Sequence, residues 1–257
     1  MIIEKELWSK IPLLHVYKEE LKNVQTPVVL FLHGFTSAKE HNLHYAYQLA
    51  EKGLRVLLPD AHLHGERQEQ LDEIQLSLRF WEIILTSIED VKTIREELIN
   101  RELIKDETKI ALAGTSMGGI ETLGCLKVYP WIDVAAVMMG SPGYVQLAKA
   151  QMAQYESRGF KLPVTEEERK HMLETLSQFD LTKNPAALNR RPVFFWHGEQ
   201  DTVVPFEPTY NFYNAIKKSY ANDPERFQFQ SDKTAGHAVS RKGLLHATEF
   251  IAENLSV

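Results

Sequence analysis

The sequence predicts an α/β fold with one mostly parallel sheet and helices on both of its faces. Short apolar runs of the kind that form buried parallel strands recur along the chain. Segments with helical periodicity separate these runs, and this alternation requires right-handed crossovers between parallel strands. With 257 residues, of which 44% are hydrophobic, the chain can bury one large core. We therefore expect a single domain over residues 1–257.

The expected strands follow one another along the chain. The residues up to Tyr17 are expected to form one or two antiparallel edge strands. Aromatic and polar residues alternate at 227–230, which predicts a last strand. The central strands are expected at five compact apolar runs: residues 28–32, 54–58, 109–113, 134–139 and 193–196.

Helices are expected between and after these strands. The clearest covers about 76–103, where apolar residues recur at spacings of three and four. Another is expected over 119–129, where Pro130 stops it. The last is expected over 242–254.

Residues 141–191 interrupt the alternation with polar helical sequence. Three glutamates at 166–168 suit the first turn of a helix that begins at Thr165, because negative charge there meets the positive end of the helix dipole. Segments of this length between strands often cover a site. We expect a helical cap over residues 141–191.

Residues 114–118 match the G-x-S-x-G pattern of a strained turn between a strand and a helix. The expected strand before this turn and the expected helix after it supply the required context. A side chain at Gly114 or Gly118 would collide where the strand and the helix cross. Because such a turn exposes a serine hydroxyl, Ser116 is the candidate nucleophile.

A serine nucleophile needs partners, and in parallel α/β sheets these lie beyond the carboxyl ends of the strands. The strand at 28–32 is followed by His33-Gly34-Phe35, where the glycine lets the backbone turn toward the nucleophile. The amides of Phe35 and Met117 are therefore the expected oxyanion donors.

The loops that follow two further strands contain a candidate acid and a candidate base. The loop after 193–196 contains Asp201, the candidate for orienting the catalytic imidazole, with Glu199 as its nearest competitor. The loop after 227–230 contains His237, which its position singles out among ten histidines as the candidate general base.

Four residues are candidate substrate-pocket walls, supplied by the helix over 76–103 and by the cap. Aromatic and methionine residues at helical spacing also occur in cores, so ordinary packing is the alternative role for all four. They are Phe80, Trp81, Tyr144 and Met152.

A metal site is not expected. His62 and His64, with His41 and His44, fit no strong zinc signature, and no cysteine ligands accompany them. We expect a loop beside the mouth of the active site instead. Cys125 is the single cysteine, so an intramolecular disulfide is excluded and a buried packing role is expected.

Net charge and hydropathy limit the classes of binding partner that we expect. A formal net charge of −6 gives no electrostatic reason to expect nucleic acid. The first residues lack the basic start and apolar core of a signal peptide, and no apolar run has the length needed to span a bilayer. We expect a cytoplasmic protein without a membrane partner. Whether it is a monomer or a homo-oligomer is left open.

Together these motifs resemble the α/β-hydrolase superfamily over nearly the whole chain. Ser116, Asp201 and His237 occur in the superfamily's chain order of nucleophile, acid and base. Within it, the chain is similar to small bacterial carboxylesterases allied to the dienelactone hydrolase and prolyl oligopeptidase branches, which often carry a short helical cap. One departure is Glu121, where similar elbows more often continue with a small residue. Further markers are His33-Gly34-Phe35, Pro59-Asp60, His64-Gly65 and Val204-Pro205.

The resemblance implies hydrolysis of small carboxylic esters through an acyl-enzyme, without a cofactor. A peptidase, an amidase or an acyltransferase on the same triad is the alternative enzyme. Dipeptide-releasing relatives, however, carry a large additional domain for which this sequence has no room. A non-catalytic binding module that kept the fold is the alternative from a different class.

Overall fold

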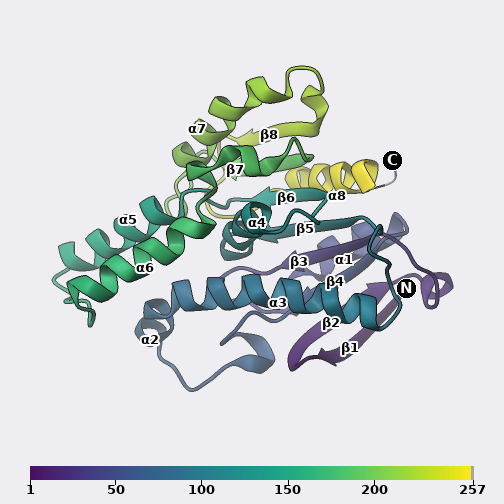
Figure 1. Cartoon of the computed structure of the whole chain (residues 1–257), viewed down its shortest axis with the longest axis horizontal. Coiled ribbons are helices and arrows are strands. Elements are labelled where there is room, and N and C mark those ends of the chain that lie inside the picture. The colour runs from purple at the N-terminus through teal and green to yellow at the C-terminus, as the bar shows by residue number, and fades with distance from the viewer. Residues whose placement is uncertain (256–257) are drawn as a thin grey trace.

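One sheet of eight strands runs through the molecule, in the order β1-β2-β4-β3-β5-β6-β7-β8 (Figure 1). The computed structural model describes residues 1–255 of the chain. The strands are β1 (Ile2–Trp8), β2 (Ile11–Tyr17), β3 (Val28–Leu32), β4 (Arg55–Pro59), β5 (Ile110–Thr115), β6 (Val134–Met138), β7 (Val193–Gly198) and β8 (Phe227–Asp232).

The sheet is mostly parallel, and the predicted α/β fold class is confirmed. β1 pairs with β2 and β2 with β4 in antiparallel register, whereas all the later neighbours pair in parallel. Every residue of β3, β4 and β6 is buried, because helices cover both faces of a parallel sheet. The carboxyl ends of the parallel strands therefore meet at one edge, where ligands bind in such sheets.

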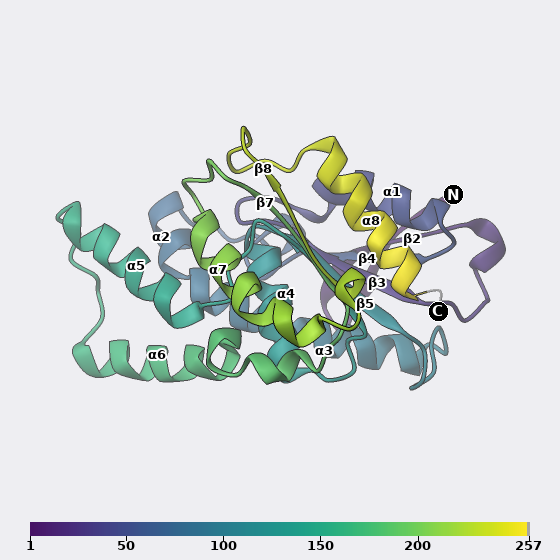
Figure 2. The ribbon, with the colours of Figure 1, turned by 90° about the horizontal axis from the view of Figure 1, so that it is seen from above.

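Helices cover the sheet on two sides (Figure 2). α1 and α8 lie together on one face and share a core with Phe31, Val56 and Trp196. α3 and α4 lie on the other face, where the larger core is. The helices are α1 (Leu43–Glu51), α2 (Glu73–Leu78), α3 (Phe80–Asn100), α4 (Met117–Val128), α5 (Tyr144–Ser157), α6 (Glu166–Phe179), α7 (Phe206–Ile216) and α8 (Arg241–Leu255).

The single helix predicted over 76–103 is two helices in the structure. Arg79, with φ −93° and ψ 9°, ends α2 and precedes α3. Asp72 opens α2 with a capping box, in which its side chain accepts from the Gln75 amide. Leu76 and Phe80 both pack against the same core. The apolar spacing therefore continues across the break, and periodicity alone could not reveal it.

Between β6 and β7 the chain forms α5, α6 and two short 3₁₀ turns, η4 (Leu181–Lys183) and η5 (Pro185–Leu188). α5 and α6 pack against each other and extend past the end of the sheet (Figure 1). Thr165 caps α6 reciprocally with Glu168, at the position where the acidic run predicts the helix to begin. We refer to α5, α6 and the residues joining them as the cap.

Candidate active site

Ser116 occupies a sharp turn between β5 and α4. Its φ of 56° and ψ of −116° lie outside the usual backbone regions, and such conformations cluster at functional sites. The crossing tolerates no side chain at either motif glycine. A Cβ at Gly114 would lie 2.3 Å from the backbone of Gly118, and a Cβ at Gly118 would lie 2.2 Å from the Leu32 carbonyl oxygen. Close packing of strand and helix thus fixes the serine at the carboxyl edge of the sheet.

His237 contacts both other members of the predicted triad. Its Nε2 lies 2.7 Å from Ser116 Oγ, and its Nδ1 lies 2.7 Å from Asp201 Oδ2. His237 lies in the loop between β8 and α8, and Asp201 in the loop after β7. The three side chains form one continuous hydrogen-bonded chain, which is the geometry that proton transfer from a serine requires.

The loops that carry the acid and the base are tied together. The Gln200 amide donates to the Ala235 carbonyl at 3.0 Å, and the Glu199 amide donates to the Asp232 carbonyl at 2.9 Å. A Cβ at Gly198 would lie 2.4 Å from the Ala235 oxygen, so glycine is needed for this approach. The spacing of Asp201 and His237 is therefore set by backbone contacts.

Asp201 is held as a buried carboxylate. Its side chain is fully buried, and its Oδ1 accepts the amides of Val203 at 2.9 Å and Val204 at 3.0 Å. Burial by itself would raise the pKa of Asp201, but the nearby His197 Nε2, 3.4 Å from Oδ2, and hydrogen bonds from His237 and Val203 outweigh burial and lower it below its ordinary value. The acid is therefore ionised at neutral pH. The competing candidate Glu199 is exposed and accepts from Ser231 instead.

The two expected oxyanion donors lie beside Ser116. A Cβ at Gly34 would be 3.5 Å from Ser116 Cβ, so the loop after β3 passes directly against the nucleophile. Phe35, Met117 and Ser116 line the same cavity. Within residues 1–255, the amides of Phe35 and Met117 donate to no protein acceptor, which leaves both available to a ligand.

Two histidines that the sequence did not assign to the site hold the loop after β3. The Thr36 amide donates to His64 Nε2 at 3.0 Å, and the Ala61 amide donates to His33 Nε2 at 3.0 Å. Each Nδ1 faces a carbonyl, His62 O for His64 and Gly34 O for His33. Both rings are therefore neutral with the proton on Nδ1. Burial lowers the pKa of His33 to about 4 and also lowers that of His64.

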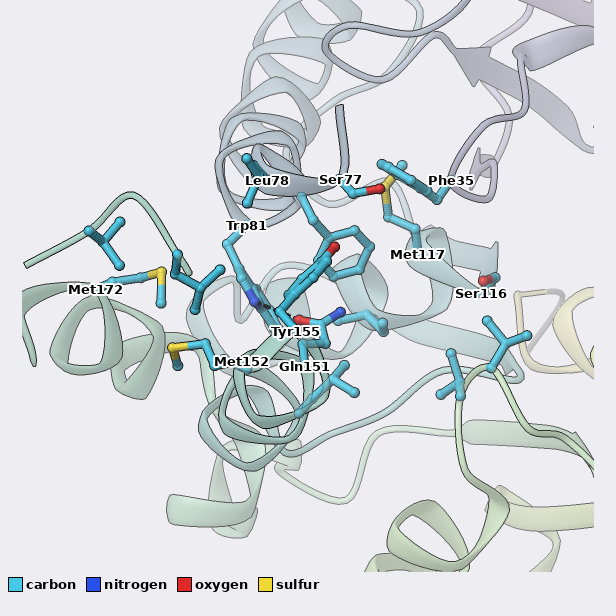
Figure 3. A pocket seen from close by; sticks show the side chains of 18 of the residues that line it. Phe35, Ser77, Leu78, Trp81, Ser116, Met117, Gln151, Met152, Tyr155 and Met172 are labelled. Atoms are coloured by element: carbon cyan, nitrogen blue, oxygen red, sulfur yellow. Dashed lines mark hydrogen bonds between the residues drawn. The ribbon is translucent and has the colours of Figure 1, made fainter. Parts of the chain in front are cut away.

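A cavity of about 280 Å³ opens from Ser116 toward the cap (Figure 3). Three of the four predicted pocket walls line it, namely Phe80 and Trp81 from α3 and Met152 from α5. Sequence reasoning did not name most of its lining, because helical spacing cannot show which face of α5 or α6 turns toward Ser116. The additional lining residues include Leu78, Leu147, Gln151, Tyr155, Leu162 and Met172.

The prediction for Tyr144 needs correction. Tyr144 is fully buried and does not line the cavity. Its hydroxyl donates to the Ile120 carbonyl at 2.7 Å, and its ring packs against that of Trp81 with centroids 5.2 Å apart. The residue is a core side chain that supports Trp81 from behind, since a buried tyrosine hydroxyl needs a partner and finds it on α4.

Glu121, the departure noted in the elbow, lies in the core. It is 1% exposed, and both carboxyl oxygens lack a hydrogen-bond partner in the described part of the chain. The Ser87 hydroxyl is adjacent, but its geometry falls short of a hydrogen bond. Burial raises the pKa of Glu121 well above its ordinary value, because it penalises the charged form of the carboxyl.

Outside this site, a cluster of two glutamates and a histidine has residue types that can bind a metal ion. Glu4, Glu6 and His15 offer ligand atoms within 4.8 Å of one another on β1 and β2. Each side chain already has partners: His15 Nδ1 lies 2.6 Å from Glu6, and Tyr17 donates to Glu4 at 2.7 Å. This arrangement is a hydrogen-bonded network at the edge of the sheet.

Comparison with known proteins agrees with the fold. The family model described as the prolyl oligopeptidase family matches residues 42–256. The chain belongs to the prolyl oligopeptidase family. It is 46% identical over 248 residues to the putative esterase YitV of Bacillus subtilis (strain 168), covering 96% of this chain and 97% of that protein. It is 31% identical over 256 residues to the esterase YjfP of Escherichia coli (strain K12), covering 98% and 99%.

The fold is also found among solved structures. TT1662 from Thermus thermophilus superposes with a TM-score of 0.76 at 22% identity, covering 100% of this chain and 98% of that chain. The resemblance to the α/β-hydrolase superfamily is confirmed, and this member of the prolyl oligopeptidase family is a serine hydrolase. No helix within residues 1–255 combines the length and apolar character that crossing a membrane requires.

Proposed function

We propose that the chain is a serine carboxylesterase that hydrolyses small carboxylic esters through an acyl-enzyme. The observation that carries this proposal is the continuous Ser116–His237–Asp201 chain, with 2.7 Å at each step, at the mouth of a largely apolar cavity. The names of the relatives in Bacillus subtilis and Escherichia coli, a putative esterase and an esterase, support the choice of ester substrates.

In the acylation step, His237 Nε2 takes the hydroxyl proton as Ser116 Oγ attacks the ester carbonyl carbon. The carbonyl oxygen becomes an oxyanion, which the amides of Phe35 and Met117 bind. Asp201 stabilises the imidazolium through Nδ1–H. The tetrahedral intermediate collapses, the imidazolium gives its proton to the alcohol oxygen, and the alcohol leaves.

In the deacylation step, a water molecule takes the place of the alcohol. His237 removes its proton as the water oxygen attacks the acyl carbon, and the same amides bind the second oxyanion. Collapse releases the carboxylic acid, and the proton returns to Ser116 Oγ. In both steps, the groups that act on the ester and on water are side chains and backbone amides of this chain.

A peptidase or amidase on the same triad is the second candidate, and the family description favours it. An acyltransferase differs only in the acceptor that replaces water. The hydrogen-bonded triad disfavours a binding module, because such a module has no need of a serine held in a strained turn.

The test is hydrolysis of p-nitrophenyl acetate, butyrate and hexanoate, with p-nitroanilides of the same acids in parallel. We expect ester turnover and fluorophosphonate labelling, and a loss of about 10⁴-fold or more in kcat for Ser116→Ala. Faster turnover of the anilides would favour the amidase. Unchanged ester turnover in Ser116→Ala would contradict the proposal.

A further inference from the structure

A hydrogen-bonded polar pair lies in the largely apolar lining of the active-site cavity, to which Ser77, Ser116 and Tyr155 also contribute hydroxyl groups. Trp81 Nε1 donates to Gln151 Oε1 at 2.9 Å, and both residues line the cavity. An indole nitrogen can only donate, so the carbonyl side of the amide must face Trp81. This contact fixes the orientation of Gln151, and its NH₂ group points away from the tryptophan (Figure 3).

The NH₂ group of Gln151 has no acceptor among residues 1–255. Figure 3 shows its nitrogen on the side of the cavity nearer Ser116. Tyr155, one turn further along α5, lines the same cavity, and its hydroxyl also lacks a partner in the described chain. When a ligand displaces water from such a donor, binding is weakened unless the ligand offers the donor an acceptor.

We expect the cavity to receive the acyl side of an ester. The leaving alcohol must contact His237, which gives it a proton, yet His237 is absent from the described residues that line the cavity. The cavity instead extends from Ser116 between α2, α3 and the cap (Figure 3). We therefore expect the chain attached to the carbonyl carbon to lie along Phe80 and Gln151, and the alcohol to lie on the other side of Ser116.

We propose that Gln151 is a substrate-binding residue and that the preferred acyl chain carries an acceptor oxygen, as an ether, ketone or hydroxyl group, part-way along an otherwise apolar chain. This inference rests on the proposed esterase function and adds a substrate class to it. Trp81 acts as a positioning residue, because its Nε1–H holds the amide with its donors toward the acyl chain.

The test compares p-nitrophenyl esters of one chain length in which a single methylene is replaced by an ether oxygen, moved one position at a time. For each position, kcat/KM of the ester with the ether oxygen is divided by kcat/KM of the plain ester. This ratio is then divided by the ratio of the rate constants for hydroxide-catalysed hydrolysis of the same two esters. The result is a corrected ratio, free of differences in intrinsic reactivity. For the wild type we expect a corrected ratio above unity at one or two neighbouring positions.

Gln151→Met keeps the length of the side chain and removes the donor. We expect it to lower the corrected ratio about 3- to 10-fold, the effect of one neutral hydrogen bond. Trp81→Phe should also lower the ratio, since it frees the amide to rotate. Met172→Leu changes an apolar wall of the same cavity and should leave the ratio unchanged. Thermal melting of each variant checks folding.

A wild-type ratio of unity at every position, or equal ratios in wild type and Gln151→Met, would overturn the inference while plain esters are still hydrolysed. Failure of the proposed function is a distinct result: no ester in either series is hydrolysed and Ser116 takes no fluorophosphonate label. In that case the inference about Gln151 fails together with the proposed esterase function.

Discussion

The backbone amide of Thr36 donates to Nε2 of His64 across 3.0 Å, which joins the loop of an oxyanion donor to the loop after β4. Thr36 has a φ of 58°, an unfavourable value for a threonine that tertiary contacts must maintain. His64 is one of these contacts, and it holds the residue directly after Phe35. Its ring also packs edge-on against the Phe35 ring, with centroids 5.3 Å apart.

Replacement of His64 by phenylalanine should therefore misplace the Phe35 amide. We expect kcat for an ester to fall about 10- to 100-fold, less than the full loss of an oxyanion donor, with KM changed by less than about 3-fold. His64→Gln retains an acceptor for the Thr36 amide and should recover most of kcat. Steady-state kinetics on the two variants decide the matter. Equal activity of His64→Phe and wild type would show that the loop needs no such support.

The carboxylate of Asp201 is the second point at which the site can be tested. Asp201→Asn keeps the size of the side chain but removes the charge that fixes the His237 tautomer, and we expect kcat to fall about 10⁴-fold. Glu199→Gln is the matched control in the same loop and should retain activity, because Glu199 faces Ser231. If Glu199→Gln lost activity and Asp201→Asn kept it, the acid would be wrongly assigned.

Glu121 predicts an unusual pH dependence of stability. The pKa of Glu121 is raised in the folded protein. The protonated carboxyl therefore contributes to the free energy of unfolding fully below the ordinary pKa of about 4.5. This contribution is lost as the pH rises toward the folded pKa. Glu121→Gln removes the ionisation. The free energy of unfolding of the variant, relative to wild type, should therefore rise between pH 5 and pH 8, by at most about 1.4 kcal/mol per pH unit.

Denaturant unfolding across that pH range measures the difference, with the exposed Glu89→Gln as a control on the same face of the sheet. A constant difference between Glu121→Gln and wild type would mean that the carboxyl finds a partner in solution that keeps it ionised.

The crossing of β5 and α4 should be intolerant of a single methyl group. A Cβ at Gly118 would lie 2.2 Å from the Leu32 oxygen, a backbone atom that cannot move without disturbing β3. We expect Gly118→Ala to lower the free energy of unfolding by about 3 kcal/mol or more. Gly143→Ala, whose Cβ would meet nothing closer than 3.6 Å, should stay within about 1 kcal/mol of wild type. Similar values for both variants would contradict this account.

The local features of this protein could be predicted from short stretches of sequence. The buried strands, the turn at Ser116 and the start of α6 at Thr165 each depend on contiguous residues whose backbone preferences agree. The strand exits also nominated the loop that carries Asp201 and its competitor Glu199, because in a parallel sheet each exit reaches the same edge. Even here, periodicity missed the break at Arg79, since both helices turn apolar residues toward one core.

The amino-acid sequence by itself determined the α/β fold and the residue types that meet at the carboxyl edge of the sheet, because these follow from local patterns repeated along the chain. Only the tertiary structure decided that Trp81 faces the cavity while Tyr144 supports it. It also decided that, among the residues that the structure describes, the Gln151 donors and the buried Glu121 carboxyl have no partner. The reason is physical. Which way a helical side chain points, and what it meets, depends on the packing of segments far apart in the chain, and no local pattern records that packing.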